Sequence, residues 1–403
     1  MTVVATVRAP LQTFRIPGYR WVWGNMLCAV ASWVLEVMVL GWLVLDLTGS
    51  AVWVGAVAGL RGVGMLGGGL IGGMLADRWG RRTLMLTVQG GMALLALGLA
   101  VLSWRDALQV VHVALAAVLL GMASAISASA RTALIYDLVG SSGMLNAVAL
   151  VNLGASLLRV VVPAGGGVLL AQGGPASVFL AIAGSYTVGV SLLVGVRAVA
   201  RQQAGSLGWR VLGQSLRTVW GDGNVRALLS LSMLNEALGY SYIYMLPVLT
   251  REVFQMGPEA LGVLTASFGV GSVAGNGVLA VLGNYPRKGV LVTLGTVGFG
   301  GFLTGFALTP WFGVAVVMLA LAGAWSVVYD AALQTLLLTH APSTLRGRTA
   351  GLLVSTWGLS PVGGVLTGAI ASVVGASWAV AVGGLVVVAN ALRLVPQVPK
   401  WER

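Results

Sequence analysis

The sequence has few of the residues that soluble enzymes use for chemistry. Among its 403 residues are one cysteine and two histidines, and 8% of the residues are charged. A single cysteine, Cys28, excludes a framework of intrachain disulfides, and two histidines with one cysteine are too few for a zinc site of nitrogen and sulfur ligands. A soluble globular chain would carry charge on about a quarter of its residues. We therefore expect neither a soluble fold nor a bound metal or cofactor.

The sequence also lacks signatures of nucleotide chemistry. The glycine runs at 67–69 and 165–167 lie within apolar segments, without the strand and the lysine that a phosphate-binding loop requires. The net charge of +12 does not gather on one polar face, which argues against nucleic acid as a partner. We expect a protein that is not an enzyme and that draws the energy it needs from a gradient.

Apolar residues are abundant: 58% of the chain is hydrophobic, and the mean hydropathy is +0.94. An apolar helix needs about 20 residues to cross the hydrocarbon of a bilayer. We therefore predict an all-α membrane protein. Short turns divide the apolar stretches into twelve predicted transmembrane helices: 21–45, 52–76, 83–103, 108–131, 144–172, 176–196, 225–249, 260–283, 289–308, 311–338, 349–374 and 376–395.

The basic residues fall in alternate gaps between these spans or near the chain ends. The exceptions are Arg61, Arg105, Arg159 and Arg251. Because cytoplasmic loops are enriched in Lys and Arg, the basic side is predicted to be cytoplasmic, and an even number of helices puts both termini there. The first twenty residues lack the compact apolar core of a cleavable signal peptide, so the first helix is expected to be its own insertion signal. This pattern predicts a multi-pass protein of the cell membrane, the inner membrane of a bacterium.

The longest connection, 197–224, is polar and divides the predicted spans into six and six. We predict two pseudo-symmetric six-helix bundles, residues 1–196 and 225–403, joined by this cytoplasmic linker. A weak internal repeat supports the division, because Gly73-Met74-Leu75-Ala76-Asp77 has a degraded echo in Gly277-Val278-Leu279-Ala280-Val281. Transporters are commonly built from such repeats.

The most specific motif is the basic loop between predicted helices two and three. It places a carboxylate and several guanidinium groups in one short turn, where they can form ion pairs and engage a helix terminus. A simpler interpretation is a basic turn that only fixes the topology. The candidate gating residues of this loop are Gly73, Asp77, Arg78, Gly80, Arg81 and Arg82.

This loop resembles the signature loop of the major facilitator superfamily. The resemblance implies that Asp77 helps to latch the two halves at the cytoplasmic face, whereas the second-half copy has Val281 in its place. Further segments extend the resemblance along almost the whole chain and narrow it to the branch similar to the enterobactin exporter, the transmembrane secretion effectors. These segments are Phe14-Arg15, Tyr19–Asn25, Thr48–Ser50, Trp53–Gly55, Arg131, Ala133–Val139, Leu145–Ala147, Arg159, Pro163–Gly167 and Leu345–Arg348.

The predicted fifth helix carries part of the family's antiporter motif. Pro163, Gly166 and Gly167 match it, although Val162 stands where a glycine usually precedes the proline. The resemblance therefore suggests export. The same residues can equally form a glycine-rich packing face with a proline kink.

Charged residues within the predicted helices are candidates for function, because each is costly in a bilayer unless it faces a partner or a watery cavity. Glu36, Arg61 and Arg159 each lie about fifteen residues from the cytoplasmic end of their helix, or about 22 Å at 1.5 Å per residue. We predict that they form one buried cluster in the first bundle. Such a cluster would keep Glu36 ionised, and its excess positive charge would suit a ligand with an anionic group.

The second bundle offers Asp330 and Glu236 as proton carriers. The interiors of its predicted helices contain no Lys or Arg to hold these carboxyls ionised, so desolvation favours their protonated forms. Asp330 is our first candidate for the coupling proton and Glu236 the second. In the alternative structural interpretation, each carboxyl simply accepts hydrogen bonds from neighbours such as Asn235, Tyr329 or Gln334. For Asp137 we expect an ion pair near the cytoplasmic surface, with Arg131 close by.

Together these features predict a secondary transporter with two halves that give alternating access to a central site. From the resemblance we expect proton-coupled export of a small hydrophobic or amphiphilic molecule, such as a drug or a siderophore, by a monomer. Its partners would be the small-molecule substrate, protons and the lipid bilayer. An importer of a nutrient and a membrane-embedded binding or scaffold protein are the alternatives.

Overall fold

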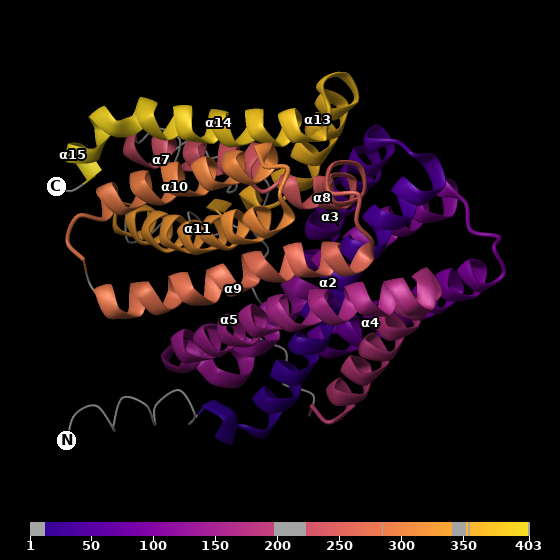
Figure 1. Ribbon diagram of the computed structural model, residues 1–403. Coiled ribbons are helices and arrows are strands. Elements are labelled where there is room, and N and C mark those ends of the chain that lie inside the picture. The colour runs from indigo at the N-terminus through magenta and orange to yellow at the C-terminus, as the bar shows by residue number, and fades with distance from the viewer. Residues whose placement is uncertain (1–12, 197–222, 284, 341–351, 354, 402–403) are drawn as a thin grey trace. The chain divides into compact units, whose positions relative to one another are not determined.

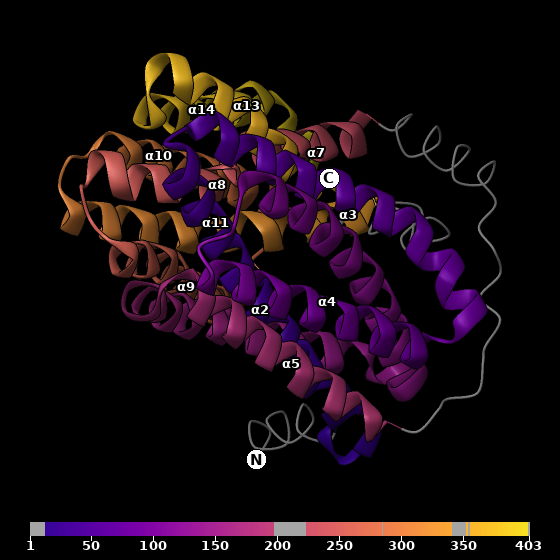
Figure 2. The same ribbon diagram turned by 90° about the vertical axis from the view of Figure 1, so that its right-hand side faces the viewer.

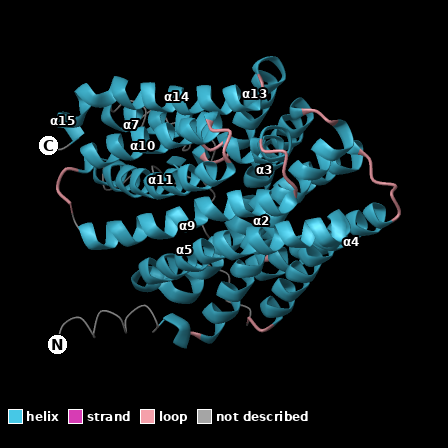
Figure 3. Cartoon of the chain, viewed as in Figure 1, coloured by secondary structure: helices cyan, strands magenta, loops and turns pink. Residues whose placement is uncertain are grey.

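The computed structural model describes residues 13–196, 223–283, 285–340, 352–353 and 355–401, and the secondary structure in these parts is helical (Figure 3). The predicted linker 197–224 lies outside the described residues except for its last two positions. The elements in chain order are η1 (Thr13–Arg15), α2 (Pro17–Thr48), α3 (Ala51–Trp79), α4 (Arg81–Trp104), α5 (Val110–Val194), α7 (Gly223–Leu234), η2 (Asn235–Gly239), α8 (Tyr242–Val248), η3 (Leu249–Val253), α9 (Pro258–Leu282), α10 (Lys288–Leu308), α11 (Phe312–His340), α13 (Leu359–Val374), α14 (Ala376–Leu394), η4 (Val395–Gln397) and α15 (Val398–Trp401).

The chain divides into two compact units, and α3 contributes to both. The first unit comprises Met1–Leu47 and Val63–Ala204, and the second comprises Thr48–Gly62 and Gly205–Arg403. In the division predicted from the sequence, the whole of α3 belongs to the first bundle. In the structure its beginning, Ala51–Gly62, belongs to the second unit.

Within the described residues, nine helices are long and apolar enough to cross a membrane. One of them, Asn146–Val194, covers two predicted spans, 144–172 and 176–196. The predicted span 225–249 is divided among α7, η2, α8 and η3. The predicted span 349–374 is represented by the 16-residue α13, because most of residues 341–354 lie outside the described parts.

The long helix α5 is interrupted at two glycines. Gly140 has φ 68° and Gly174 has φ 65°, a left-handed conformation that L side chains rarely adopt. The chain therefore changes direction there, and α5 consists of three helical segments, 110–139, 141–173 and 175–194. Pro175 follows the second break, where its ring suits the first turn of a helix. The turn predicted around Gly173 to Pro175 lies at this break.

Helices α4 and α5 pack side by side in the first unit (Figure 2). Two side chains of α2 tie that helix to the middle segment of α5, because the Tyr19 hydroxyl donates to the carbonyl of Ala147 at 2.9 Å and the Trp23 indole donates to that of Leu150 at 3.0 Å. A side chain on Gly68 of α3 would collide with the backbone of α5. Membrane helices commonly use glycine in this way, because it lets two helix backbones approach closely.

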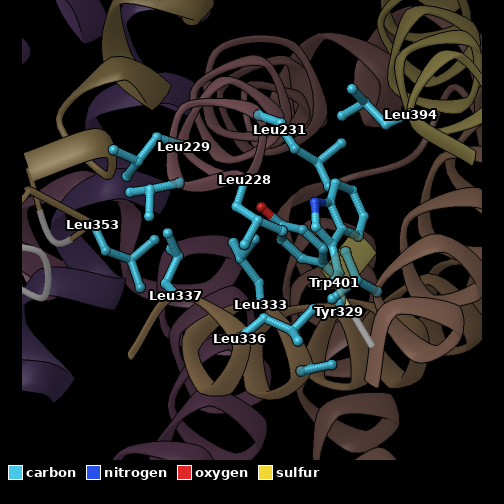
Figure 4. Close-up of a cluster of buried hydrophobic side chains, with 14 residues drawn as sticks. Leu228, Leu229, Leu231, Tyr329, Leu333, Leu336, Leu337, Leu353, Leu394 and Trp401 are labelled. Carbon is cyan, nitrogen blue, oxygen red and sulfur yellow. The ribbon is translucent and has the colours of Figure 1, made fainter. Parts of the chain in front are cut away.

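In the second unit α9, α10, α11 and α14 run side by side (Figure 1). A cluster of buried apolar side chains lies between α7 and α11 and continues to the end of the chain. Figure 4 shows Leu228 and Leu231 of α7 packed with Tyr329 and Leu333 of α11 and with Trp401 of α15. This cluster fixes α7 at the point where its regular hydrogen bonding ends.

Candidate functional site

The second unit contains a break in helical hydrogen bonding beside Glu236. At η2 the chain forms a π-helical turn, in which the amide of Tyr240 donates to the carbonyl of Asn235 at 2.9 Å. Single π turns within helices are frequent at functional sites. The apolar pattern of residues 225–249 predicted a transmembrane helix there, and it gave no indication of this π turn.

Two glycines of neighbouring helices explain where the break lies. A Cβ atom on Gly363 of α13 would overlap the carbonyl oxygen of Ala237, and one on Gly383 of α14 would lie 2.6 Å from that of Leu238. These glycines let two helices press directly on the backbone of η2. Irregular backbone at membrane depth is tolerated where protein covers it in this way.

Two pairs of hydroxyl groups, one before and one after the π turn, join this segment to neighbouring parts of the second unit. Ser232 and Thr356 lie 2.8 Å apart, and Ser241 and Thr367 lie 2.9 Å apart, with all four side chains buried. Each pair satisfies polar atoms that would otherwise be desolvated without a partner. The π turn is thus held in place at both of its ends.

The structure brings the two predicted proton carriers close together. Glu236, in η2, is 7% exposed, whereas Asp330, in the middle of α11, is exposed. The Tyr240 hydroxyl donates to Oδ2 of Asp330 at 2.9 Å, and the carboxyls of Glu236 and Asp330 lie within electrostatic range of each other. Two carboxyls and a phenol therefore share one polar region.

Two of the three donors suggested by the alternative structural interpretation, Asn235 and Tyr329, do not bind these carboxyls in the described part of the chain. Both amide atoms of Asn235 and the hydroxyl of Tyr329 are buried, and none of them donates to Glu236 or Asp330. The donor to Asp330 is instead Tyr240, whose hydrogen bond the sequence did not predict. The sequence did contain one indication of this donor, because Tyr240 follows Glu236 by four residues, about one helical turn.

Arg61 changes the electrostatics expected for the second unit. It is 3% exposed and belongs to this unit through the beginning of α3. Both Arg61 and Glu236 act electrostatically on Tyr244, which also contacts Ser360. Our expectation that no cation lies deep in the second half considered only helices seven to twelve, and it missed an arginine contributed by helix two.

In the first unit Glu36 lies in the interior of α2 and is completely buried. The hydroxyl of Tyr186, in the last segment of α5, donates to Oε1 of Glu36 at 2.6 Å. Arg131 lies within electrostatic range of the same tyrosine. The sequence did not identify Tyr186, because a single tyrosine in an apolar helix is usually a packing or interface residue.

Arg159 lies apart from this buried group. It is exposed at the centre of the middle segment of α5, and among the described residues it forms no ion pair with Glu36. Arg61 falls in the other unit. The predicted cluster of Glu36, Arg61 and Arg159 therefore stays a prediction.

A buried polar network crosses the first unit. The amide of Asn25 donates to Gln89 at 2.6 Å and to the carbonyl of Gly189 at 3.0 Å. Gln89 in turn donates to Ser127 at 2.8 Å, and Arg131 donates to the same hydroxyl at 3.4 Å. This network links α2, α4 and two segments of α5, and the sequence predicted none of it.

The basic loop lies where predicted, between α3 and α4. Gly80 has φ 78°, which makes the turn, and Arg81 forms an ion pair with Asp137 and donates to the carbonyl of Ala133 at 2.7 Å. Asp137 thus pairs with the loop and not with the nearby Arg131 that we expected. The carbonyls of Leu193 and Val194 accept hydrogen bonds from Arg82, at 3.0 and 2.9 Å.

Other predicted gating residues have less definite positions. Arg78 is exposed at the end of α3. Gly73 and Asp77 lie within that helix, but their side-chain positions are outside the described part of the structure, so the predicted latch at Asp77 stays a prediction.

The helix-five motif packs against the first helix. Pro163, Gly166 and Gly167 are buried, and a Cβ atom on Gly166 would lie 2.5 Å from Leu35 and 3.1 Å from Met38, both in α2. This geometry agrees with the packing interpretation of the motif.

Among the described residues, no group of three or more His, Cys, Asp or Glu could hold a metal ion.

The all-helical fold, with charged groups deep in long apolar helices, is that of a multi-pass membrane transporter. The chain belongs to the transmembrane secretion effector family of major facilitator transporters, which it matches over residues 8–403. Members of this family are transporters and not enzymes.

Named relatives and solved structures agree with this assignment. The chain is 29% identical over 303 residues to the enterobactin exporter EntS of Salmonella choleraesuis (strain SC-B67), covering 74% of this chain and 72% of the relative. The corresponding protein of Escherichia coli O1:K1 / APEC is 29% identical over 301 residues, with the same coverage. The crystal structure of the nucleoside transporter NupG has a TM-score of 0.72 at 13% identity, covering 94% of this chain and 98% of that one. A bacterial homologue of the human lysosomal transporter Spinster, inward-facing and unoccupied, has a TM-score of 0.71 at 16% identity, covering 96% of both chains.

Proposed function

We propose that this protein is a proton-coupled exporter of small hydrophobic or amphiphilic molecules, working by alternating access in a bacterial inner membrane. Family membership supports transport, and the enterobactin exporters among its relatives support export of a siderophore-like compound. In this proposal the protein acts as a monomer with both termini in the cytoplasm.

The proposed architecture has twelve membrane crossings in two halves, residues 1–196 and 225–403. It counts the doubly long Asn146–Val194 segment as two crossings, the π-interrupted segment from α7 to η3 as one, and α13 with the residues before it as one. The basic loop from Gly73 to Arg82 gates the cytoplasmic side. Its anchoring by Arg81 to Asp137 supports a rigid loop that could hold Asp77 in place.

The observation that carries the proposed coupling is the pair of carboxyls beside the π turn. Asp330 is exposed and can exchange a proton, while Glu236 is nearly buried and lies within its electrostatic range. Two carboxyls within electrostatic range repel each other when both are ionised, most strongly in a region of low dielectric constant. We assign the coupling proton first to Asp330 and then to Glu236.

Transport by purified protein in liposomes tests this function. Enterobactin, for which the relatives are named, is the first compound, and a pH-sensitive dye reports proton movement when it is added. We expect compound and protons to move in opposite directions. Everted membrane vesicles should accumulate the compound, whereas an importer would fill right-side-out vesicles.

The variant Asp330→Asn separates coupling from binding. It should lose proton-driven uphill transport and keep exchange of labelled for unlabelled compound across the membrane. Glu259→Gln, at an exposed position at the start of α9, is the matched control and should behave as the wild type. If Asp330→Asn and Glu236→Gln both keep full proton-driven transport, the proposed coupling is wrong.

A further inference from the structure

The middle segment of α5 has a polar face that the proposed coupling does not use. Asn152, Ser156 and Arg159 are spaced at i, i+4 and i+7, so they lie within about 60° of one another around the helix at 100° per residue. Asn152 and Arg159 are exposed and Ser156 is half-buried. In a segment that is otherwise almost wholly apolar, these side chains form one continuous stripe.

An exposed apolar face lies on the other side of the same segment. Leu153, Leu157 and Val161 are 59%, 53% and 66% exposed and follow one another at i, i+4 and i+8. Large exposed aliphatic side chains suit contact with lipid. An arginine at the centre of a membrane helix is costly in hydrocarbon and belongs on the side that faces water or a ligand.

Within the described parts of the chain, the polar stripe makes no polar contact with other side chains. Asn152, Ser156 and Arg159 have no side-chain hydrogen bond or ion pair there. The carboxylate of the same unit that could compete, Glu36, is completely buried and accepts its hydrogen bond from Tyr186. Arg159 is therefore available to an external anion.

The chemistry of the stripe selects its ligand. Arg159 supplies five N–H donors in a planar fork that matches two oxygens of a carboxylate, sulfonate or phosphate. The amide of Asn152 and the hydroxyl of Ser156 can donate to a third oxygen from the same helix face. No carboxylate on this stripe opposes a negative charge.

We propose that Asn152, Ser156 and Arg159 bind the anionic group of the substrate, so that the transporter selects amphiphilic anions over neutral molecules of the same shape. This inference rests on the proposed transport function and names its substrate class. Arg159 carries most of the selectivity, and Asn152 and Ser156 orient the bound group.

Two fluorescent probes with the same aromatic body test the selectivity. Anilinonaphthalene sulfonate carries a negative charge, and N-phenylnaphthylamine lacks the sulfonate and is neutral. Full-length protein in lipid nanodiscs is titrated with each probe, and the rise in melting temperature gives an apparent affinity. We expect the wild type to prefer the sulfonate, and Arg159→Gln to weaken sulfonate binding by about tenfold to a hundredfold, because a hydrogen-bonded charge pair is removed.

Further variants guard against a general folding defect. Arg159→Lys keeps the charge without the fork and should bind the sulfonate with intermediate affinity, and Asn152→Ala should weaken it by about threefold to tenfold. Arg105→Gln, at an exposed position beyond the end of α4, is the matched control and should leave both probes unaffected. The proposal is overturned if the wild type shows no preference for the sulfonate, or if Arg159→Gln weakens both probes equally.

Binding and coupling fail in distinguishable ways. If Arg159→Gln alone loses the sulfonate but the wild type moves no compound with protons, the anion site stands and the proposed transport function falls. If proton-driven transport is found and Arg159→Gln handles both probes as the wild type does, only the anion site falls.

Discussion

The hydroxyl of Tyr240 donates a 2.9 Å hydrogen bond to Oδ2 of Asp330, although the two residues are 90 positions apart in sequence. Tyr240 follows directly on the π turn η2, and Asp330 lies in the middle of α11. The bond joins the irregular part of one helix to a carboxyl within another. Any shift of the π turn would therefore alter the surroundings of the proposed proton carrier.

Replacing Tyr240 with Phe isolates this bond. Phe keeps the ring contact with Phe299, whose centroid is 4.9 Å away, but removes the hydroxyl that stabilises the carboxylate of Asp330 after its proton leaves. A hydrogen bond to a charged group contributes about 1.5–3 kcal/mol. We expect proton-driven transport to fall about tenfold or more, while binding of the compound changes little.

Tyr136→Phe is the control for this variant, because Tyr136 is 47% exposed in the first unit. It should transport as the wild type does. Equal rates for Tyr240→Phe and wild type, measured over several pH gradients in liposomes, would remove Tyr240 from the coupling site.

Helical segments and the turn at Gly174 could be predicted from the sequence, but the π turn within residues 225–249 could not. Apolar length places the spans, and the turn at Gly174 is signalled by Gly-Gly-Pro. Nothing in residues 225–249 signals a π turn at Asn235, because its cause is the close packing of Gly363 and Gly383, which are more than a hundred positions away. Local pattern carries no information about such distant contacts.

The polar contacts show the same limit. Sequence singled out Glu36, Glu236 and Asp330 because a charge in an apolar run is conspicuous. Their partners Tyr186 and Tyr240 are ordinary aromatic residues in such runs, and only the packing of helices reveals them as donors. The sequence also did not show that Arg61 groups with the second unit, since the linker predicts two halves but not which unit each end of a helix packs with.

The packing of Gly363 against the π turn predicts a loss of stability on substitution. In Gly363→Ala the new methyl group overlaps the carbonyl oxygen of Ala237, so α13 must move away. Overpacking of this kind costs about 1–3 kcal/mol. We expect a lower melting temperature in detergent, with reduced coupled transport because the segment that carries Glu236 shifts.

Gly301→Ala is the matched control for that change. Gly301 also lies in a helix of the second unit, but a Cβ atom there meets nothing within 4 Å. Alanine has the higher helix propensity, by about 1 kcal/mol, so this variant should be unchanged or slightly more stable. A melting temperature for Gly363→Ala that matches that of Gly301→Ala would refute the steric account of the π turn.

The buried amide pair of Asn25 and Gln89 should contribute measurably to the stability of the first unit. Gln89→Ala removes a 2.6 Å hydrogen bond to Asn25 and a 2.8 Å bond to Ser127, and it leaves buried polar groups without partners. Each such loss costs about 1–3 kcal/mol. We expect a lower melting temperature, while Thr87→Val, on the same helix but bonded only within it, should have a small effect.

A double-mutant cycle tests whether the two amides act together. Asn25→Ala, Gln89→Ala and the double variant are compared by thermal unfolding. Because the partners share a bond, the double variant should lose less stability than the sum of the singles, by about 1 kcal/mol. Strict additivity would mean that the contact contributes nothing.

The ion pair of Arg81 with Asp137 predicts that charge exchange can rescue the basic loop. Asp137→Arg places two cations together at a site where the Asp137 side chain is 8% exposed, and Arg81→Asp places two carboxylates there. Each single variant should lose most transport and about 3–5 kcal/mol of stability, because a largely buried charge is left unpaired. The double exchange restores opposite charges and should recover part of the transport and part of the stability.

Arg82 bonds only to carbonyls in the described structure, so Arg82→Asp combined with Asp137→Arg serves as the mismatched control and should show no recovery. Equal behaviour of the two double variants in liposome transport would show that the pairing of Arg81 with Asp137 does not position the loop.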